Sequence, residues 1–298
     1  MSFFIIQYRV EHFIYRRLKK IYEEVSVLDV NDLKKETATT DIDEISKKMK
    51  NYVEGKRLEI KNLTERDSFR RDFIGNVAHE LKTPLFTVQG YILTLLEGAI
   101  DDKDIRIKYL ERANKGVDRL TAVIKDLDMI AKLENEGTKL NIISFNIIEL
   151  VQNVFDLLEM KAKKRNISLL FDKFYEFPIF VKGDIEKIEQ VLINLIVNSI
   201  KYGKPNGTTV ISIENYNNRK LIFKVTDNGE GIQQKHLSRL FERFYRVDQS
   251  RSREQGGSGL GLSIVRHIVE AHDENIFLKS TYGKGSEFSF TIEKDLKL

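Results

Sequence analysis

The stretch "LERANKGVDRLTAVIKDLDMIA", residues 110–131, carries the pattern that decides the first half of the fold. Its apolar residues recur at alternating spacings of three and four, at Leu110, Ala113, Val117, Leu120, Ile124, Leu127 and Ala131. This spacing places them along one side of an α-helix, as in helices that pack together in a bundle. We therefore predict a long helix with one apolar seam.

An upstream stretch repeats the pattern almost completely, at Ile74, Val77, Leu81, Leu85, Val88, Ile92 and Leu95. Between the two seams, "EGAIDDKD" (97–104) supplies a turn. Residues 67–136 are thus predicted to form a helical hairpin. Because two helices alone cannot bury both seams well, we expect two copies to form a dimeric four-helix bundle, which makes the chain a homodimer.

The pattern changes from about residue 140 onward, where helical stretches alternate with β-rich ones. The β-rich stretches are "ISLLF" (167–171), "PIFVKG" (178–183), "TTVISIE" (208–214), "KLIFKVTD" (220–227), "NIFLKS" (275–280) and "SEFSFTI" (286–292). Such alternation predicts a sheet covered by helices. The chain is therefore predicted to be multidomain, with an all-α hairpin followed by an α/β two-layer sandwich over residues 140–298.

The bulk composition excludes some functions. The 298 residues carry a net charge of +4, which does not call for nucleic acid as a partner. The chain has no cysteine, so disulfides, thiolate metal sites and thiol catalysis are excluded.

Residues 1–66 are predicted to be a helical linker with a break near residues 31–44. "FFII" (3–6) and "RRLKK" (16–20) resemble the cytoplasmic exit of a transmembrane helix, although no stretch approaches the roughly 20 apolar residues that a full span needs. An ordinary amphipathic helix explains them equally well. We expect a membrane tether through this segment and a location on the cytoplasmic side of the membrane.

A histidine interrupts the upstream helix in "NVAHELKTPL" (76–85). His79 lies two residues from Val77 and from Leu81, so it points ~200° away from the seam and into solvent. Thr83 shares this exposed face, whereas Glu80 reaches the imidazole only by folding back. Pro84 removes a helical hydrogen bond and permits a bend. An exposed imidazole beside a carboxylate is a competent nucleophile.

The longer stretch "FIGNVAHELKTPL" (73–85) resembles the H box of the sensor histidine kinases of two-component signalling. The resemblance implies that His79 is autophosphorylated and that Glu80 is the general base. Thr83 matches the position that orients a water in members that also dephosphorylate their partner. Residues 41–55 resemble a HAMP-type two-helix relay only weakly, which makes residues 1–66 a HAMP-like linker.

The second domain carries three further motifs of this family. "GDIEKIEQVLINLIVNSIKYG" (183–203) places Asn194, Asn198 and Lys201 on one side of an apolar helix, where asparagines are costly unless they bind something. It resembles the N box, which implies that Asn198 is a ligand of Mg²⁺ and that Lys201 and Tyr202 contact the nucleotide. An amide oxygen suits this hard cation.

"VTDNGEGI" (225–232) resembles the G1 box, whose aspartate accepts the adenine amino group. "GGSGLGLSIVRHIVEAH" (256–272) resembles the G2 box, a glycine loop that opens a helix where backbone N–H groups bind phosphates, with Ser258 in place of the usual threonine. Between them, Arg246 is either a phosphate contact or a solvated surface arginine. The predicted ATP-binding residues are Asn194, Asn198, Lys201, Tyr202, Asp227, Gly229, Gly231, Arg246, Gly257, Gly259 and Gly261.

The resemblance implies an ATP- and Mg²⁺-dependent protein histidine kinase. It phosphorylates its own His79, passes the phosphoryl group to an aspartate of a response regulator, and can also dephosphorylate that partner. Three alternatives remain: a regulator phosphatase acting through Thr83, a non-catalytic nucleotide-gated scaffold, and an ATPase of the gyrase or chaperone type. His12, His236, His267 and His272 lack the acid-and-proline context of His79 and are expected to be surface or packing residues.

Overall fold

The computed structural model describes residues 42–135, 140–247 and 258–296. The chain divides into two compact units, Met1–Gly75 and Asn76–Leu298, and the sites discussed below lie within the second. Both "FFII" and "RRLKK" lie outside the described residues. Within the described ranges, no helix is both long enough and apolar enough to span a membrane.

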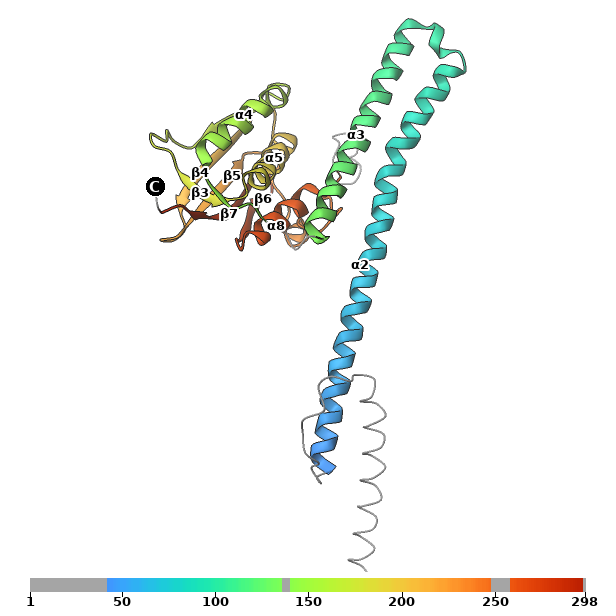
Figure 1. Cartoon of the computed structure of the whole chain (residues 1–298). Coiled ribbons are helices and arrows are strands. Elements are labelled where there is room, and N and C mark those ends of the chain that lie inside the picture. Colours follow the sequence, from blue (N-terminus) through green and yellow to red (C-terminus); the bar gives the residue numbers. More distant parts are fainter. Residues whose placement is uncertain (1–41, 136–139, 248–257, 297–298) are drawn as a thin grey trace, which may run out of the picture. The chain divides into compact units, whose positions relative to one another are not determined.

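The predicted helical hairpin is confirmed (Figure 1). Helix α2 covers Ile42–Leu96, a 3-10 turn η1 covers Ala99–Asp101, and helix α3 covers Lys103–Asn135. Gly98 enters the turn with φ 114°, a conformation that glycine adopts at no steric cost. The predicted domain limit at residue 66 falls inside the continuous helix α2.

The apolar residues of the predicted seam on α3 differ in burial: some lie in the interior of the hairpin and others face outward. Ala113 is buried in the hairpin, whereas Leu110, Val117 and Ile124 of the same seam are exposed in the single chain. The buried side of α3 also includes Val123, which the predicted seam left out. An apolar stripe wide enough for a bundle thus presents one row of residues to its hairpin partner and another row outward, in line with the expectation that two helices alone cannot bury both seams.

Helices α2 and α3 approach each other closely at Gly116. A Cβ atom placed there would lie 2.5 Å from Val88 Cγ2 and 3.5 Å from the carbonyl oxygen of Pro84. A side chain at this position would therefore have to displace Val88, so glycine permits the close approach of the two helices beside the turn that carries His79.

The predicted α/β domain is also confirmed. Its strands form one seven-stranded sheet in the order β1-β3-β7-β5-β4-β2, with β6 paired to β7. All pairings are antiparallel except that of β2 with β4. The bounds are β1 Ile143–Asn146, β2 Ser168–Phe171, β3 Phe180–Gly183, β4 Thr208–Asn215, β5 Lys220–Asp227, β6 Ile276–Thr281 and β7 Gly285–Lys294.

Three amphipathic helices cover the sheet: α4 (Ile147–Lys163), α5 (Ile185–Tyr202) and α8 (Gly261–Ala271), with a short α6 (Gln234–Leu237) beside β6. Burial alternates along β4 and β5, so one face of these strands meets the helices. The core between the layers centres on a stacked pair, Phe223 and Phe290, with ring centroids 5.2 Å apart.

Two helices of this layer begin at side-chain caps that also fasten neighbouring strands. Asn146 Oδ1 accepts from the N–H of Ile148 at the start of α4 and from that of Ile179 next to β3. Asp184 caps α5 by accepting from the N–H of Lys187, and its second oxygen accepts from the N–H of Asn141. These caps fix where α5, and with it the predicted nucleotide residues, begins.

Candidate functional site

His79 is exposed on α2, as predicted. Thr83 lies one turn further along, and its hydroxyl donates to the His79 carbonyl oxygen at 3.4 Å. Helix α2 continues through Pro84, which is buried against α3. Because proline has no N–H, the carbonyl of Glu80 loses its usual helical donor. The imidazole is thus displayed on a turn with one fewer backbone hydrogen bond.

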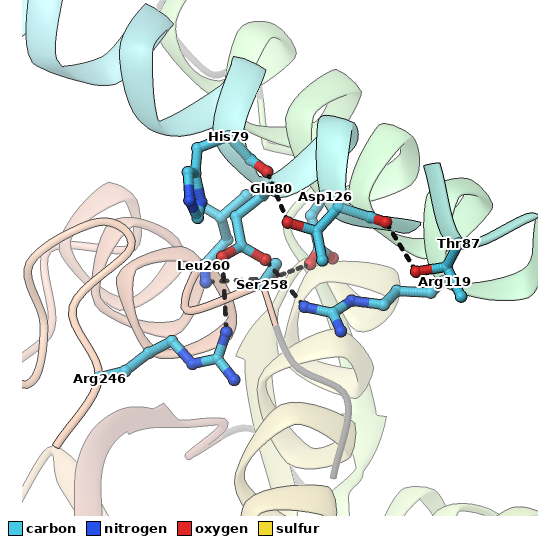
Figure 2. Close-up of polar contacts among 9 residues, drawn as sticks. His79, Glu80, Thr87, Arg119, Asp126, Arg246, Ser258 and Leu260 are labelled. Atoms are coloured by element: carbon cyan, nitrogen blue, oxygen red, sulfur yellow. Dashed lines mark hydrogen bonds and ion pairs between the residues drawn. The ribbon is translucent and has the colours of Figure 1, made fainter. Parts of the chain in front are cut away.

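Glu80 is directed at two guanidinium groups (Figure 2). Its carboxylate lies 3.0 Å from Nη2 of Arg119 on α3 and 3.5 Å from Nη1 of Arg246 in the nucleotide domain. The side chains of Glu80, Arg119 and Arg246 are only 14%, 19% and 8% exposed. The alternative that Arg246 is a solvated surface residue was therefore wrong. In this arrangement, Glu80 faces the arginines.

The predicted nucleotide residues of α5 gather around a buried polar spot. The amide nitrogen of Asn194 is buried and has no hydrogen-bond partner within the described part of the chain. Asn198 follows one turn later and is half-buried. Lys201 Nζ lies 5.0 Å from the centroid of the Tyr202 ring. These four side chains come from the C-terminal half of α5.

The charge around Lys201 is strongly positive. Burial, together with the nearby charges of Arg246, Arg119 and Arg165, lowers the pKa of Lys201 to about 8. Arg165 also donates from Nη1 to the carbonyl oxygens of Ile200 and Lys201 at the end of α5. A cation cluster of this kind is stabilised by an added anion, such as a phosphate.

Asp227 ends β5 and is held from two sides. Its Oδ1 accepts from the N–H of Gly229 at 2.9 Å and from that of Ser286 at 3.3 Å. Burial raises the pKa of the Asp227 carboxyl, and these two hydrogen bonds act in the opposite direction. At Gly231, which has φ 68°, a Cβ atom would lie 2.1 Å from the Thr281 carbonyl oxygen. This glycine is required by the close packing of the turn.

The second glycine motif opens α8. Gly259 has φ 75°, and a Cβ there would lie 2.9 Å from the backbone of Phe244. Gly261 is the first residue of α8, and a Cβ on it would lie 3.3 Å from Asn194 Oδ1. The structure therefore brings Gly261 beside Asn194 of α5, whereas Gly259 packs against the backbone of Phe244. Gly257, the third predicted glycine, lies outside the described residues.

Three groups that sequence reasoning missed complete the site: Arg119, Arg165 and Asp126. Asp126 on α3 accepts a hydrogen bond from the Ser258 hydroxyl at 2.6 Å, and that hydroxyl accepts from the N–H of Leu260 at 3.1 Å. Arg119 and Asp126 are seven residues apart, so they share one side of α3. This shared side of α3 was the only indication in the sequence that the two residues act together. Without their contacts to Glu80 and Ser258, both residues have the pattern of charged side chains exposed to solvent.

The residues present fit a nucleotide with a divalent cation. The buried Asn194 amide supplies a hydrogen-bond donor, the glycines leave room for close backbone approach, and the cations face an anion. The described residues hold no cluster of three or more carboxylates or histidines able to bind a metal. A Mg²⁺ ion that accompanies a nucleotide takes many of its ligands from phosphate oxygens and water, so it does not require such a cluster.

The other histidines within the described residues are packing residues, as expected for them. His272 accepts from the N–H of Asp184 at 3.0 Å and pairs with the Ile268 carbonyl at 2.8 Å. His236 pairs with the Tyr245 hydroxyl at 2.7 Å, and His267 is half-buried on α8. His12 lies outside the described residues.

Comparisons with known proteins match both the helical hairpin and the α/β domain. Residues 69–136 match the family model "His Kinase A (phospho-acceptor) domain". Residues 183–296 match the model "Histidine kinase-, DNA gyrase B-, and HSP90-like ATPase". The first match includes His79, and the second includes the glycine motifs. The order of the two matches along the chain is that of the predicted motifs.

Curated relatives and solved structures agree. The chain is 35% identical over 227 residues to the sensor histidine kinase WalK of Bacillus subtilis and 35% identical over 228 residues to the sensor protein kinase WalK of Staphylococcus aureus. These matches cover 76% and 75% of this chain, but only 37% and 53% of those proteins, so the chain spans about half or less of their length.

Two solved histidine kinases share the fold. The histidine kinase ThkA, in complex with the response regulator protein TrrA, matches with a TM-score of 0.63 and 29% identity, over 80% of this chain and 66% of that chain. The Acinetobacter baumannii histidine kinase AdeS matches with a TM-score of 0.56 and 28% identity, over 74% of this chain and 98% of that one.

Proposed function

The chain belongs to the sensor histidine kinases, with a phosphoacceptor domain and an ATP-binding domain, and on this premise we propose that it transfers the γ-phosphoryl group of ATP to His79 and from there to an aspartate of a response regulator. The observation that carries the proposal is the contact between Glu80, the neighbour of His79, and Arg246 of the nucleotide domain. An exposed imidazole and a phosphate-binding segment come within side-chain reach of each other.

The first step is a phosphoryl transfer to nitrogen. A ring nitrogen of His79 attacks the γ-phosphorus, a P–N bond forms, and the bond to the β-phosphate oxygen breaks as ADP leaves. Glu80 accepts the imidazole proton after it leaves the arginines that hold it here. Lys201 and Arg246 neutralise charge on the phosphates, because positioning and electrostatics dominate such transfers. Mg²⁺, bound through Asn198, would neutralise part of the same charge.

The nucleotide site supports ATP as the phosphoryl donor. Asp227 would accept from the adenine amino group, and Lys201 and Tyr202 at the end of α5 would contact the nucleotide. Close backbone packing at Gly229, Gly231 and Gly259 leaves no room for side chains there. Asn194 offers its buried amide nitrogen to a phosphate.

The partners follow from the exposed hairpin. The apolar residues Leu110, Val117 and Ile124 remain exposed on α3, which supports a homodimer that buries them in a four-helix bundle. A response regulator would dock on the outer surface of that bundle near His79 and Thr83. The N-terminal "FFII" and "RRLKK" support a membrane tether.

Labelling with γ-³²P-ATP and Mg²⁺ tests the assignment. We expect the wild-type chain to acquire label that is lost in acid and stable in base, and His79→Gln to acquire none. The variant should bind the ATP analogue AMPPNP as the wild type does, which shows that the nucleotide domain is intact. Label of the same chemistry on His79→Gln would contradict the proposal.

A further inference from the structure

Two carboxylates of the hairpin contact the nucleotide domain, one from each helix. Glu80 on α2 lies 3.5 Å from Arg246, and Asp126 on α3 lies 2.6 Å from the Ser258 hydroxyl (Figure 2). The two contacted groups lie 12 residues apart in the nucleotide domain, and both belong to segments assigned above to ATP phosphates. Arg246 precedes the glycine loop, and Ser258 lies within it.

The Asp126 contact is built into the start of α8. Ser258 donates to Asp126 and accepts from the N–H of Leu260, so its hydroxyl has one orientation. Asp126 therefore approaches the N-terminal side of α8, where the first backbone N–H groups lack helical partners and favour negative charge. Asp126 is half-buried; its burial raises the pKa of its carboxyl group, and the hydrogen bond from Ser258 acts in the opposite direction.

The Glu80 contact lies among the cations around Lys201. Arg246, Arg119 and Arg165 each lower the pKa of Lys201, so these four positive groups repel one another. Glu80 is the carboxylate that meets two of them, at 3.0 Å and 3.5 Å. A carboxylate and a phosphate use the same charge-assisted hydrogen bonds to a guanidinium group.

We propose that Glu80 and Asp126 occupy, in this arrangement, the interactions that ATP phosphates use, so that this docking of the hairpin and the binding of nucleotide phosphates oppose each other. The proposal rests on the proposed function, because that function assigns Arg246 and the glycine loop to phosphates. Coupling of this kind is reciprocal: phosphates weaken the docked contacts by the factor by which the docked contacts weaken phosphate binding.

The arrangement also determines when Glu80 can act as the base for His79. Glu80 cannot accept a proton from His79 while both arginines hold it. Phosphates that take Arg246 leave Glu80 with Arg119 alone, which makes the carboxylate easier to move toward the imidazole. The base would thus become available only when a nucleotide is bound, and the empty nucleotide domain keeps it engaged.

Calorimetric binding to the full chain tests the proposal. The probe is AMPPNP with Mg²⁺, and adenosine, which has no phosphate, is the second ligand. We expect Asp126→Asn, which keeps the shape and removes the charge, to bind AMPPNP about five-fold more tightly than wild type and adenosine equally well. Glu80→Gln should also bind AMPPNP more tightly and adenosine equally well. Because the calorimeter measures binding and not phosphoryl transfer, the loss of Glu80 as a base does not affect this result.

The matched control is Asp128→Asn, which removes a charge two residues away on the same helix. Asp128 is exposed and paired with Lys132 at 2.9 Å, so AMPPNP binding should equal that of wild type. Equal or weaker binding of AMPPNP by both Asp126→Asn and Glu80→Gln overturns this proposal and leaves the proposed function standing. Failure of the wild-type chain to bind AMPPNP would overturn the proposed function and this proposal together.

Discussion

At the scale of single residues, the pKa of Lys201 reflects the charge and the burial of the residues around the nucleotide site. Lys201 lies on α5 beside Tyr202, is half-buried, and has the charges of Arg246, Arg119 and Arg165 near its ammonium group. These surroundings lower its pKa to about 8, from an ordinary value of 10.5. The group is therefore positively charged at neutral pH and loses its proton in a range that experiments reach easily.

This pKa predicts a pH dependence of nucleotide binding. As the pH rises through about 8, Lys201 becomes neutral and its attraction for phosphate is lost, so the affinity for AMPPNP should fall between about pH 7 and pH 9. Lys201→Arg, which stays charged throughout, should show a flatter profile. Calorimetry at several pH values measures both, and identical slopes in the two chains would contradict the assignment.

The same scale shows what the sequence could and could not predict. The exposure of His79 was predicted correctly because it depends only on helical periodicity. Arg119 and Asp126 were missed because their partners, Glu80 and Ser258, are 39 and 132 residues away in the chain. The burial of Arg246 stayed open for the same reason.

At the scale of elements, the start of α5 is set by one buried side chain. Both carboxylate oxygens of Asp184 accept backbone N–H groups, at 3.2 Å from Lys187 and 3.1 Å from Asn141. The cap therefore joins the helix to the segment that enters β1. Its loss would leave two backbone donors without acceptors in a region that is largely closed to water.

We expect Asp184→Ala to destabilise the nucleotide domain by about 2 kcal/mol. Asp184→Asn keeps one acceptor oxygen, so about half of that loss should return. Thermal unfolding of the three chains, followed by circular dichroism, measures the order. Equal midpoints for wild type and Asp184→Ala would show that the cap is dispensable.

Secondary structure was predictable wherever apolar periodicity was long. The strand over residues 220–227 was predicted with the bounds of β5. Strand β1 was missed because it runs directly into α4 at Ile147, so that its few apolar residues merge with those of the helix. The direction of each hairpin row was also undetermined, because the seam pattern does not say which row meets the hairpin partner and which faces outward.

For the whole molecule, the exposed rows of the hairpin are the feature that a single chain leaves unexplained. Leu110 is 54% exposed and Ile124 57% exposed on α3, and Leu85 is 54% exposed on α2. Large apolar side chains at regular helical spacing on one surface are typical of an interface between chains.

Ile124→Glu should therefore weaken self-association by at least about ten-fold, because a carboxylate would be buried against apolar residues. The control is Leu157→Glu on α4, which is 63% exposed and lies outside the hairpin; it should associate as the wild type does. Sedimentation equilibrium compares the three. A wild-type chain that stays monomeric at all concentrations would contradict the dimer.

The proline inside α2 has a mechanical consequence. The backbone of Glu80 already lacks its donor at Pro84, so the axis of the helix can tilt at this level without breaking any further backbone hydrogen bond. On α3, Gly116 lies close to the Pro84 carbonyl oxygen and to Val88, so the two helices are in contact at this point. We therefore expect a bend of α2 at Pro84 to move the turn that bears His79 relative to α3.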